Sequence, residues 1–303
     1  MTSIDSVLLI AFGGPTAPSE IRPFLDNVTR GRSIPRERLE EVAHHYEAMP
    51  GGRSPLKALT DAQAAGLRAR LGGRLRVYVG MRNWHPYLHE VLAAMADDGG
   101  RRALGVILSA FRCEASWERY MADVAAARER VAAAPEVVYA PPWFEHPRFI
   151  AAVADRVRAA FAEVPPAERD RTPLIFTAHS IPRPMAETSP YVADFGAAAT
   201  AVARRLGHAR WLLAYQSRSG GPRDPWLEPD VNDTIRDLAK AGERRVLLVP
   251  IGFVVDHVEV LYDLDTEARA IAAQHGVAYH RAAAVNDHPE FIDLLAELVH
   301  ESA

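Results

Sequence analysis

The sequence predicts an α/β protein built from two similar domains, each with a four-stranded parallel sheet. Short apolar runs rich in branched side chains alternate with longer amphipathic stretches throughout the chain. That alternation is typical of βαβ units, in which helices cover both faces of a parallel sheet. Three pairs of matching segments occur in the same order in the two halves, which indicates an internal duplication. A chain of 303 residues also suits two domains better than one.

The first half begins with VLLIAF at 7–12, an uninterrupted apolar run of the kind that is buried on both faces of a sheet. Further runs follow, separated by segments in which apolar residues recur at helical spacing. The other strands expected here are 77–81, 105–111 and 137–140, and the expected helices are 17–28, 36–48, 56–71, 86–98, 116–133 and 147–163.

The second half repeats the alternation, with LIFTAH at 174–179 as its first strand. Proline and charged residues in FAEVPPAERDRTP (161–173) indicate a linker. The predicted domains are therefore 1–165 and 166–303, and the last helix can pack back on the first domain. The other strands expected here are 211–216, 246–253 and 277–280, and the expected helices are 188–206, 228–241, 256–274 and 288–301.

The duplication rests on segments that share residues and position, although chance similarity in an Ala-rich chain is the alternative. It places Phe12 and His179 at equivalent strand ends. We therefore expect them to face each other across a cleft at the C-terminal edges of the sheets, where open α/β folds bind ligands. The pairs are AFGGP (11–15) with AHSIP (178–182), RRALGVILSAF (101–111) with RRVLLVPIGF (244–253), and EHPRFIAAVADRV (145–157) with DHPEFIDLLAELV (287–299).

Composition and charge argue against several classes of protein. The net charge is −4 and no basic block stands out, which argues against binding of nucleic acid or of an anionic membrane. No apolar run reaches about 18 residues and the N-terminus lacks a basic signal region, so we expect a cytoplasmic protein without an integral membrane segment. Cys113 is the single cysteine, which excludes a disulfide within the chain and a four-cysteine zinc site or iron–sulfur cluster.

His179 ends the strand LIFTAH, immediately before Ser-Ile-Pro turns the chain. A neutral imidazole at the edge of a sheet can act as a general base or bind a metal ion. The alternative is a histidine that is hydrogen-bonded within its own loop. Position alone leaves both interpretations open.

A run of acidic residues follows the strand that ends in the second half's PIGF. In a regular helix Glu259, Asp263 and Glu267 share one face, where each like-charged pair costs roughly 0.2–0.5 kcal/mol. Asp256 and Glu259 also have the spacing of a capping box with Asp256 as N-cap, and a run of acids can simply be a solvated face. The functional alternative is a route for a hydrated divalent cation, because carboxylate oxygens are ligands that such ions exchange readily.

Two further segments are interrupted by Gly and Pro. YQSRSGGPRDPWLEPD (215–230) mixes polar and aromatic residues and is predicted to be a binding loop. In GGRSPL (51–56), Ser54 can cap the next helix ahead of a proline. Arg30 and Arg32 lie near the rim of the first domain, where they can bind ligand carboxylates or simply be solvated.

Together these segments resemble ferrochelatases, enzymes that insert iron(II) into porphyrins. The resemblance covers nearly the whole chain and is carried by LLIAFGGP, GGRSPL, FTAHSIP, YQSRSGGPRDPWLEPD and, most specifically, PIGFVVDHVEVLYDLDTEA. It implies two similar Rossmann-like domains with a porphyrin cleft between them. It also implies a lyase with iron(II) as substrate and no permanently bound cofactor. The iron–sulfur cluster of some relatives is not expected with a single cysteine.

The resemblance assigns roles to individual residues. It implies that His179 and Glu259 are the paired catalytic residues and contact the metal. Asp263 and Glu267 match acids that line a metal path, and so complete the implied metal-binding set. The implied substrate-binding positions are Phe12, Arg30, His45, Tyr46, Ser54 and Tyr120.

The short spacing between GGP and GGRSP resembles the compact bacterial enzymes that use coproporphyrin III. Phe12 stands where those enzymes often have an iron-ligating tyrosine. Because it has no donor oxygen, we expect it only to pack on the macrocycle. His45 and Thr29 stand where the family pattern has arginine, although Arg30 is adjacent. The propionate contacts are therefore expected to differ from those of the best-known members.

The predicted reaction is insertion of Fe(II) into coproporphyrin III in haem biosynthesis, by distortion of the ring and removal of the pyrrole protons. The expected partners are the porphyrin and ferrous iron, without nucleic acid, and the chain is expected to be a monomer. A protoporphyrin IX ferrochelatase, or insertion of another metal such as cobalt, is the alternative within the enzyme class. A haem- or metal-binding module on the same scaffold is the non-enzyme alternative.

Overall fold

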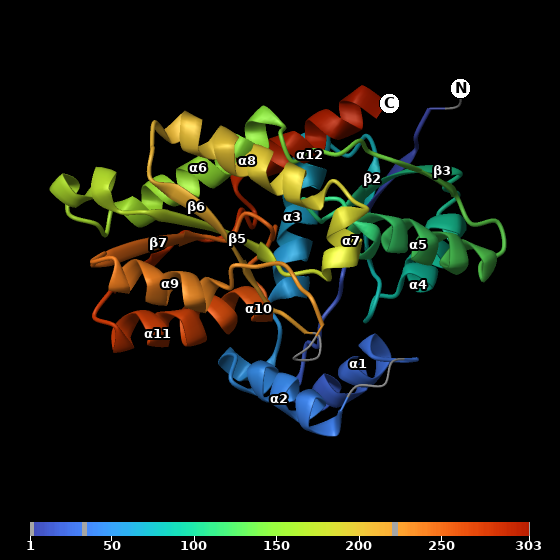
Figure 1. Cartoon of the computed structure of the whole chain (residues 1–303). Coiled ribbons are helices and arrows are strands. Elements are labelled where there is room, and N and C mark those ends of the chain that lie inside the picture. Colours follow the sequence, from blue (N-terminus) through green and yellow to red (C-terminus); the bar gives the residue numbers. More distant parts are fainter. Residues whose placement is uncertain (1–2, 32–34, 220–223, 303) are drawn as a thin grey trace. The chain divides into compact units, whose positions relative to one another are not determined.

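The computed structural model describes residues 3–31, 35–219 and 224–302, and the chain divides into two compact units (Figure 1). Each unit holds one four-stranded sheet, and all strands of both sheets are parallel. The predicted α/β class with two similar parallel sheets is confirmed. Unit 1 comprises residues 1–108, 115–141 and 292–303, and unit 2 comprises residues 109–114 and 142–291.

The sheet of unit 1 places β1 between β2 and β3. Its strands are β1 (Ser6–Ala11), β2 (Arg76–Met81), β3 (Arg102–Ile107) and β4 (Glu136–Tyr139), in the order β2-β1-β3-β4. Every residue of β1 is buried, as expected for a parallel strand that is covered on both faces.

Helices cover both faces of the first sheet. On one face α4 and α5 lie together, and Leu92 and Met95 join Leu8 in a buried cluster. On α3, a Cβ added to Gly66 would lie 3.0 Å from the Ile292 side chain, so this helix and the end of the chain approach closely. The helices are α1 (Ile21–Val28), α2 (Arg36–Glu47), α3 (Leu56–Leu71), α4 (Leu88–Asp97) and α5 (Arg119–Glu129).

The sheet of unit 2 has the same order as the first, strand for strand. Its strands are β5 (Leu174–His179), β6 (Trp211–Gln216), β7 (Arg245–Val249) and β8 (Ala278–Arg281), in the order β6-β5-β7-β8. β5 therefore corresponds to β1, and β7 to β3, which supports the predicted duplication.

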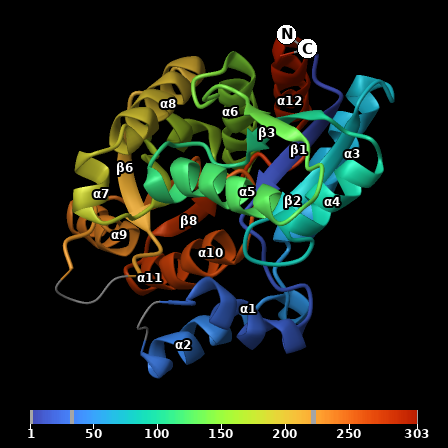
Figure 2. The same cartoon turned by 90° about the vertical axis from the view of Figure 1, so that its right-hand side faces the viewer.

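The second sheet is also covered on both faces (Figures 1 and 2). α9 and α11 pack together on one face, where Ile235 and Ala272 join Val246 in the core, and α6 and α8 pack together on the other. The helices are α6 (Pro147–Phe161), α7 (Arg183–Glu187), α8 (Tyr191–Leu206), α9 (Val231–Lys240), α10 (Val258–Leu261), α11 (Arg269–Gln274) and α12 (Pro289–Ser302).

The helix that ends each sequence repeat belongs to the unit built mainly by the other repeat. α6 follows β4 in the chain, yet it belongs to unit 2 and packs on β7, β8 and α8. From Ile292 onward α12 belongs to unit 1. There Arg70 of α3 forms an ion pair with Asp293 at 2.5 Å. Each repeat thus contributes its last helix to the other unit: α6 to unit 2, and most of α12 to unit 1.

Predicted and observed bounds differ for several elements, such as β3 (Arg102–Ile107 rather than 105–111), and two of the differences concern the chain before and after Glu259. β7 ends at Val249 rather than at residue 253, because Pro250 has no N–H to continue the ladder. The helix expected at 256–274 is broken into α10, a π-helical turn over Asp263–Ala268 and α11. Both differences lie in the segment that leads to the predicted acidic residues.

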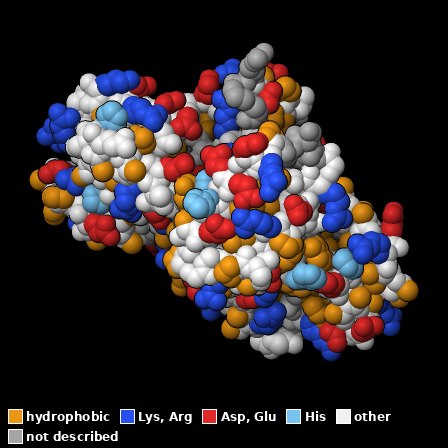
Figure 3. All heavy atoms as spheres, turned by 90° about the horizontal axis from the view of Figure 1, so that it is seen from below, with side chains coloured by type: hydrophobic (Ala, Val, Ile, Leu, Met, Phe, Trp, Pro, Cys, Tyr) orange, Lys and Arg blue, Asp and Glu red, His pale blue; other side chains and the backbone are white. Residues whose placement is uncertain are grey.

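The surface carries charges of both signs. Figure 3 shows Lys and Arg interspersed with Asp and Glu over the described part of one face, in line with a net charge of only −4. Over residues 3–31, 35–219 and 224–302, none of the helices combines the length and apolar character needed to cross a membrane.

Candidate active site

His179 is the last residue of β5, at the C-terminal edge of the second sheet. Its carbonyl oxygen accepts a hydrogen bond from the Tyr191 hydroxyl at 2.9 Å. Its ring Nδ1 contacts the carbonyl oxygen of Ser180. Because a carbonyl oxygen can only accept, Nδ1 carries a proton, and in the neutral ring the lone pair is then on Nε2. This tautomer leaves Nε2 available as a base or a metal ligand.

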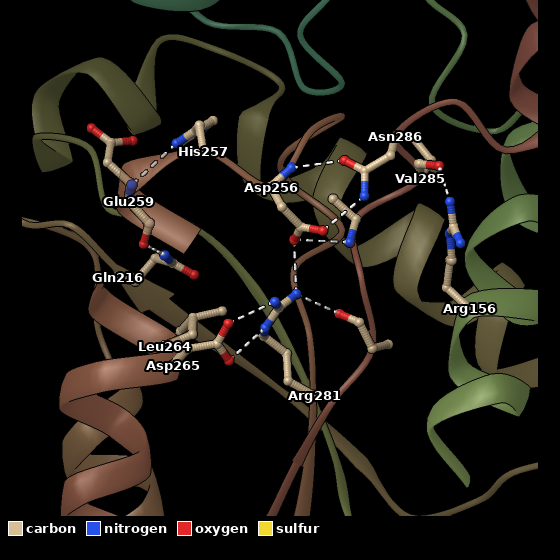
Figure 4. Close-up of polar contacts among 12 residues, drawn as sticks. Arg156, Gln216, Asp256, His257, Glu259, Leu264, Asp265, Arg281, Val285 and Asn286 are labelled. Atoms are coloured by element: carbon tan, nitrogen blue, oxygen red, sulfur yellow. Dashed lines mark hydrogen bonds and ion pairs between the residues drawn. The ribbon is translucent and has the colours of Figure 1, made fainter. Parts of the chain in front are cut away.

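Glu259 lies in the first turn of α10 with its main chain fixed on both sides (Figure 4). Its amide donates to Nδ1 of His257, the residue that caps the helix, at 3.2 Å. Its carbonyl oxygen accepts from Nε2 of Gln216 at 2.8 Å, and Gln216 is the β6 residue in register with His179. The buried side chain of Gln216 therefore links the end of β6, which lies beside His179, to the helix that carries Glu259.

The predicted capping box is wrong. The N-cap is His257, so Glu259 is the second residue of the helix rather than the third. The Asp256 carboxylate instead accepts from Arg281 at 2.8 Å and from the Asn286 side chain at 2.8 Å. A guanidinium forms stronger, charge-assisted bonds than a helix amide, which explains the choice.

The side chains of His179 and Glu259 converge. Nε2 lies 3.8 Å from Oε1, and the two side chains are 30% and 41% exposed. This separation is too long for a hydrogen bond. It is shorter than two metal–ligand bonds of about 2.1 Å each, so one ion can contact both atoms. The arrangement suits capture of a divalent ion at a partly exposed edge.

Asp263 and Glu267 lie beyond a change of helix type. In the π-helical turn the Glu267 amide donates to the Tyr262 carbonyl, five residues earlier, at 3.0 Å. The acids therefore do not form the regular α-helical stripe that was predicted. Asp263 accepts a hydrogen bond from the Ser217 hydroxyl, and Glu267 is exposed. Among the described residues no three His, Cys, Asp or Glu side chains are grouped to hold a metal, so these acids do not join the pair in one ligand set.

A second imidazole at the site was not among the predicted residues. The Nδ1 of His257 accepts the Glu259 amide, which places its proton on Nε2, and the Phe253 ring lies 4.8 Å away between centroids. Burial lowers the pKa of His257, so the ring is neutral near pH 7. The Asp-His pair in VVDHVE was the available signal, but the capping role fell to the histidine rather than to Asp256.

The predicted binding loop lies beside His179. The Leu227 amide donates to the Ile181 carbonyl at 3.0 Å, and the Ser180 hydroxyl donates to the Leu227 carbonyl at 2.8 Å. These bonds hold Trp226 with its ring centroid 6.5 Å from that of His179. The Gly-Gly-Pro-Arg stretch of the loop lies outside the described residues. The part that is described puts an aromatic surface next to the imidazole.

The segment after β7 approaches the end of β5 closely. The Gly252 amide donates to the Thr177 carbonyl at 3.0 Å. A Cβ on Gly252 would lie 2.7 Å from the Cα of Ala178, closer than real Cβ atoms come. Glycine is therefore required where the chain leading to Glu259 passes the strand that carries His179.

Phe12 lies just after β1 in unit 1 and is 39% exposed. Asn83 holds the Phe12 carbonyl with its main-chain amide at 2.9 Å and its side-chain amide at 3.1 Å. Arg82 lies over the Tyr120 ring at 4.2 Å and 6.0 Å from the Phe12 centroid. It is also paired with Asp123 at 2.5 Å. Sequence reasoning missed Arg82, because no local motif marks an arginine that bridges two distant aromatic residues.

The other predicted substrate contacts in unit 1 differ in exposure. Ser54 accepts a hydrogen bond from the Leu56 amide at 3.3 Å just before α3, whose N-cap position is Pro55 rather than the predicted Ser54. Burial lowers the pKa of His45. Arg32 lies outside the described residues. Arg30 is exposed, His45 is half-buried, and Tyr46, Ser54 and Tyr120 are buried.

Two solved structures of similar fold are of the chelatase SirB. SirB from Bacillus subtilis with Fe3+ matches with a TM-score of 0.62 at 11% identity, covering 98% of this chain and 95% of that one. The sirohydrochlorin chelatase SirB from Bacillus subtilis subspecies spizizenii in complex with cobalt matches with a TM-score of 0.57 at 12% identity, covering 98% and 94%. At these identities the likeness concerns the fold alone.

Relatives by sequence are much closer. The coproporphyrin III ferrochelatase of Mycolicibacterium smegmatis is 45% identical over 308 aligned residues, covering 99% of this chain and 90% of that protein. The coproporphyrin III ferrochelatase of Mycobacterium leprae is 44% identical over 301, covering 98% and 89%. The Ferrochelatase family profile matches residues 5–303. This chain therefore belongs to the ferrochelatase family.

Proposed function

We propose that this chain inserts iron(II) into coproporphyrin III, as a lyase of the porphyrin metal chelatase class in haem biosynthesis. The observation that carries metal insertion is the approach of His179 Nε2 to Glu259 Oε1, 3.8 Å apart in unit 2. The choice of coproporphyrin III is supported by relatives named for that substrate at 44–45% identity over nearly the whole chain.

His179 would accept pyrrole protons, present the metal, or do both in sequence. The Ser180 carbonyl holds its Nδ1, so Nε2 has the lone pair that either role needs. A positioned general base contributes about 10²–10⁴ to a rate. The Tyr191 hydroxyl on the His179 carbonyl supports the main chain from behind. These contacts let the ring act without first changing tautomer.

Glu259 would bind iron(II) through its carboxylate. Its main chain is already held by His257 and Gln216, so loading the side chain requires little ordering of the backbone. Insertion exchanges one dication for two pyrrole protons. A carboxylate beside the imidazole stabilises both the incoming ion and the imidazolium that forms when His179 takes a proton.

Asp263 and Glu267 would pass the cation toward Glu259 or carry protons away from it. The support is that both acids follow Glu259 in the same helical segment, with Asp263 held by Ser217 and Glu267 exposed. Carboxylates exchange hydrated divalent ions readily, which suits residues that transfer an ion rather than store it.

The porphyrin would be bent by apolar side chains so that its nitrogen lone pairs tilt out of the ring plane. Phe12, which is exposed, and Trp226, which lies next to His179, are the candidates for this contact. Phe12 has no oxygen and cannot ligate the product iron. Distortion of this kind costs roughly 1–5 kcal/mol, drawn from binding elsewhere on the ligand.

The propionates would bind side chains of unit 1. Arg30 is exposed and would supply a positive charge. His45, whose pKa is lowered by burial, would donate as a neutral imidazole. Tyr46, Ser54 and Tyr120 are buried and would reach a carboxylate only through their hydroxyl groups. Arg30 and His45 are therefore the first contacts to test.

The function is tested by comparing coproporphyrin III with protoporphyrin IX as substrates for ferrous iron under anaerobic conditions. We expect faster turnover of coproporphyrin III, because its four carboxylates offer two more anchors than protoporphyrin IX does. Preferential turnover of protoporphyrin IX would contradict the proposed substrate. Tight binding of both porphyrins without metal insertion would indicate a binding module instead.

We also propose a cytoplasmic monomer without a resident cofactor. Iron is then a substrate, and Cys113, the single cysteine, cannot supply the thiolates of a cluster. Sedimentation of the purified protein and metal analysis before any iron is added test these two points. A stable dimer would contradict the monomer, and stoichiometric iron in the purified protein would contradict the absence of a cofactor.

A further inference from the structure

The helix that begins near Glu259 contains a π-helical turn with partners outside the helix. The turn covers Asp263–Ala268, and in it the Glu267 amide donates to the carbonyl of Tyr262, five residues earlier. Such turns are rare and are frequent at functional sites. The contacts that hold this one come from the edge strand β8.

Two side chains of β8 reach the turn. The Tyr279 hydroxyl donates to the Leu264 carbonyl at 2.7 Å. Arg281, two residues further and therefore on the same face of the strand, binds both carboxylate oxygens of Asp265. Its Nε lies at 2.8 Å and its Nη2 at 2.7 Å. This bidentate pairing fixes the orientation of Asp265 as well as its position.

Arg281 also holds the residues in front of Glu259 (Figure 4). Its Nη1 donates to Asp256 at 2.8 Å. Asp256 in turn accepts from Asn286 Nδ2 at 2.8 Å, and its own amide donates to Asn286 Oδ1 at 2.9 Å. Asn286 has a φ of 50°, a left-handed conformation that asparagine tolerates better than most residues. Asp256 is thus fixed through its main chain and its side chain.

One guanidinium therefore spans the stretch from Asp256 to Asp265, which carries Glu259 and Asp263. Only 11% of the Arg281 side chain is exposed, against 15% for Asp256 and 26% for Asp265. Water competes weakly at such a site, so the electrostatic bonds are stronger than at the surface. The two ends of the stretch are consequently tied to the same point of β8.

We propose that Arg281 is a positioning residue that sets the metal affinity of Glu259 without touching the metal, an inference that rests on the proposed function. We call Arg281 with Asp256 and Asp265 the Arg281 clamp. Groups that orient a metal ligand from outside change metal affinity or activity typically 10–100-fold when mutated. The clamp would act by keeping Glu259 within 3.8 Å of His179.

The test measures Zn²⁺ binding by calorimetry and coproporphyrin III binding by fluorescence for the wild type, Arg281→Met and Asp265→Asn. Zn²⁺ serves as the probe because it has no redox chemistry. We expect the Kd for Zn²⁺ to rise about 10–100-fold in Arg281→Met and less in Asp265→Asn, which keeps one acceptor. Porphyrin affinity should not change in either variant. If Arg281→Met does not fold, Asp265→Asn decides.

Arg245→Met is the matched control. Arg245, at the start of β7 in the same unit, donates to Glu168 through two nitrogens, Nε at 3.0 Å and Nη2 at 2.8 Å, both to the single oxygen Oε2. Its loss should lower the melting temperature without changing the Kd for Zn²⁺. If Zn²⁺ binding were weakened equally in Arg281→Met and Arg245→Met, the clamp would be overturned. The same holds if Arg281→Met bound Zn²⁺ with the wild-type Kd.

Hydrogen exchange separates failure of the clamp from failure of the proposed function. Amides in residues 258–268 should exchange faster in Arg281→Met and at the wild-type rate in Arg245→Met. Suppose that the wild type does not insert iron, but that exchange is faster in Arg281→Met and unchanged in Arg245→Met. The proposed function then fails, while the positioning of the segment by Arg281 stands. If exchange is the same in all three proteins, the clamp is wrong even when the wild type is active.

Discussion

The two histidines next to Glu259 are held as opposite tautomers. His179 contacts the Ser180 carbonyl through Nδ1, so in its neutral form the lone pair is on Nε2, 3.8 Å from the Glu259 carboxylate. His257 uses the lone pair of its Nδ1 to accept the Glu259 amide. In each ring one nitrogen makes a hydrogen bond to the main chain. Only His179 directs its other nitrogen at the Glu259 carboxylate.

Glu259→Gln tests whether this residue has a structural role as well as a chemical one. The caps of α10 involve only the main chain of Glu259, so we expect the free energy of unfolding to change by no more than about 0.5 kcal/mol. Iron insertion should fall by about 10²-fold or more, because the charge is lost. Thermal unfolding and an anaerobic insertion assay measure the two effects. A large loss of stability with normal turnover would show that Glu259 has a structural role and no chemical one.

Among the secondary-structure elements, a recurring device is the histidine cap. His146 before α6, His257 before α10 and His288 before α12 each accept, through Nδ1, the amide two residues later, at 3.3, 3.2 and 3.3 Å. His146 and His288 belong to the matching EHP and DHP segments of the two repeats. A capping imidazole must have a free lone pair on Nδ1, and the pKa values of His257 and His288 are lowered, so the starts of α10 and α12 are coupled to pH.

His288→Asn tests that coupling. The pKa of His288 is lowered, chiefly by burial and then by nearby Arg156, so the unfolded chain binds a proton near pH 6.5 that the folded chain does not. Its contribution to stability is therefore complete above about pH 6.5 and declines as the pH falls toward its folded-state pKa. Asparagine caps without titrating. We expect equal stability of the two proteins near pH 8 and a shallower loss for the variant below about pH 6.5, measured by urea unfolding. Parallel curves would argue against the histidine cap.

Gly252→Ala tests the contact between β5 and the segment after β7. The new Cβ would meet Ala178 at 2.7 Å, so one of the two segments must move, at a cost of about 1–3 kcal/mol. Iron insertion should also slow, because His179 and Glu259 would shift relative to each other. Gly196→Ala in α8 is the control: among the described residues no atom outside the neighbouring backbone of α8 lies within 4 Å of its added Cβ, and it should be neutral or stabilising. Equal activity of the two variants would show that the β5 contact does not position the site.

Over the whole molecule, the sequence predicted what depends on local pattern. Apolar runs located the eight strands found among the described residues, with β5 and β6 placed to the residue, since buried parallel strands leave a clear signal. It also predicted His179 and Glu259 as the central pair, and the structure brings them together. Their chemical roles remain predictions.

What escaped the sequence depends on contacts between distant segments. The π-helical turn is held by Arg281 and Tyr279 from β8, and no property of the residues 256–274 alone distinguishes it from a regular helix. The placement of α6 in unit 2 likewise follows from its packing on β7 and β8 rather than from its own sequence. Gln216 resembles any other strand-end residue until its register with His179 is known.

Joint action of His179 and Glu259 in iron insertion is tested most directly by a double-mutant cycle. The rate of iron insertion into coproporphyrin III is measured anaerobically for the wild type, His179→Ala, Glu259→Gln and the double variant, with porphyrin binding measured in parallel. Residues that act as one unit on one ion are strongly non-additive. We therefore predict that porphyrin binding persists in all four proteins and that the double variant is no slower than the slower single one. Joint action would be contradicted if the rate losses of the two single variants multiplied in the double variant. It would also be contradicted if either single variant inserted iron at the wild-type rate.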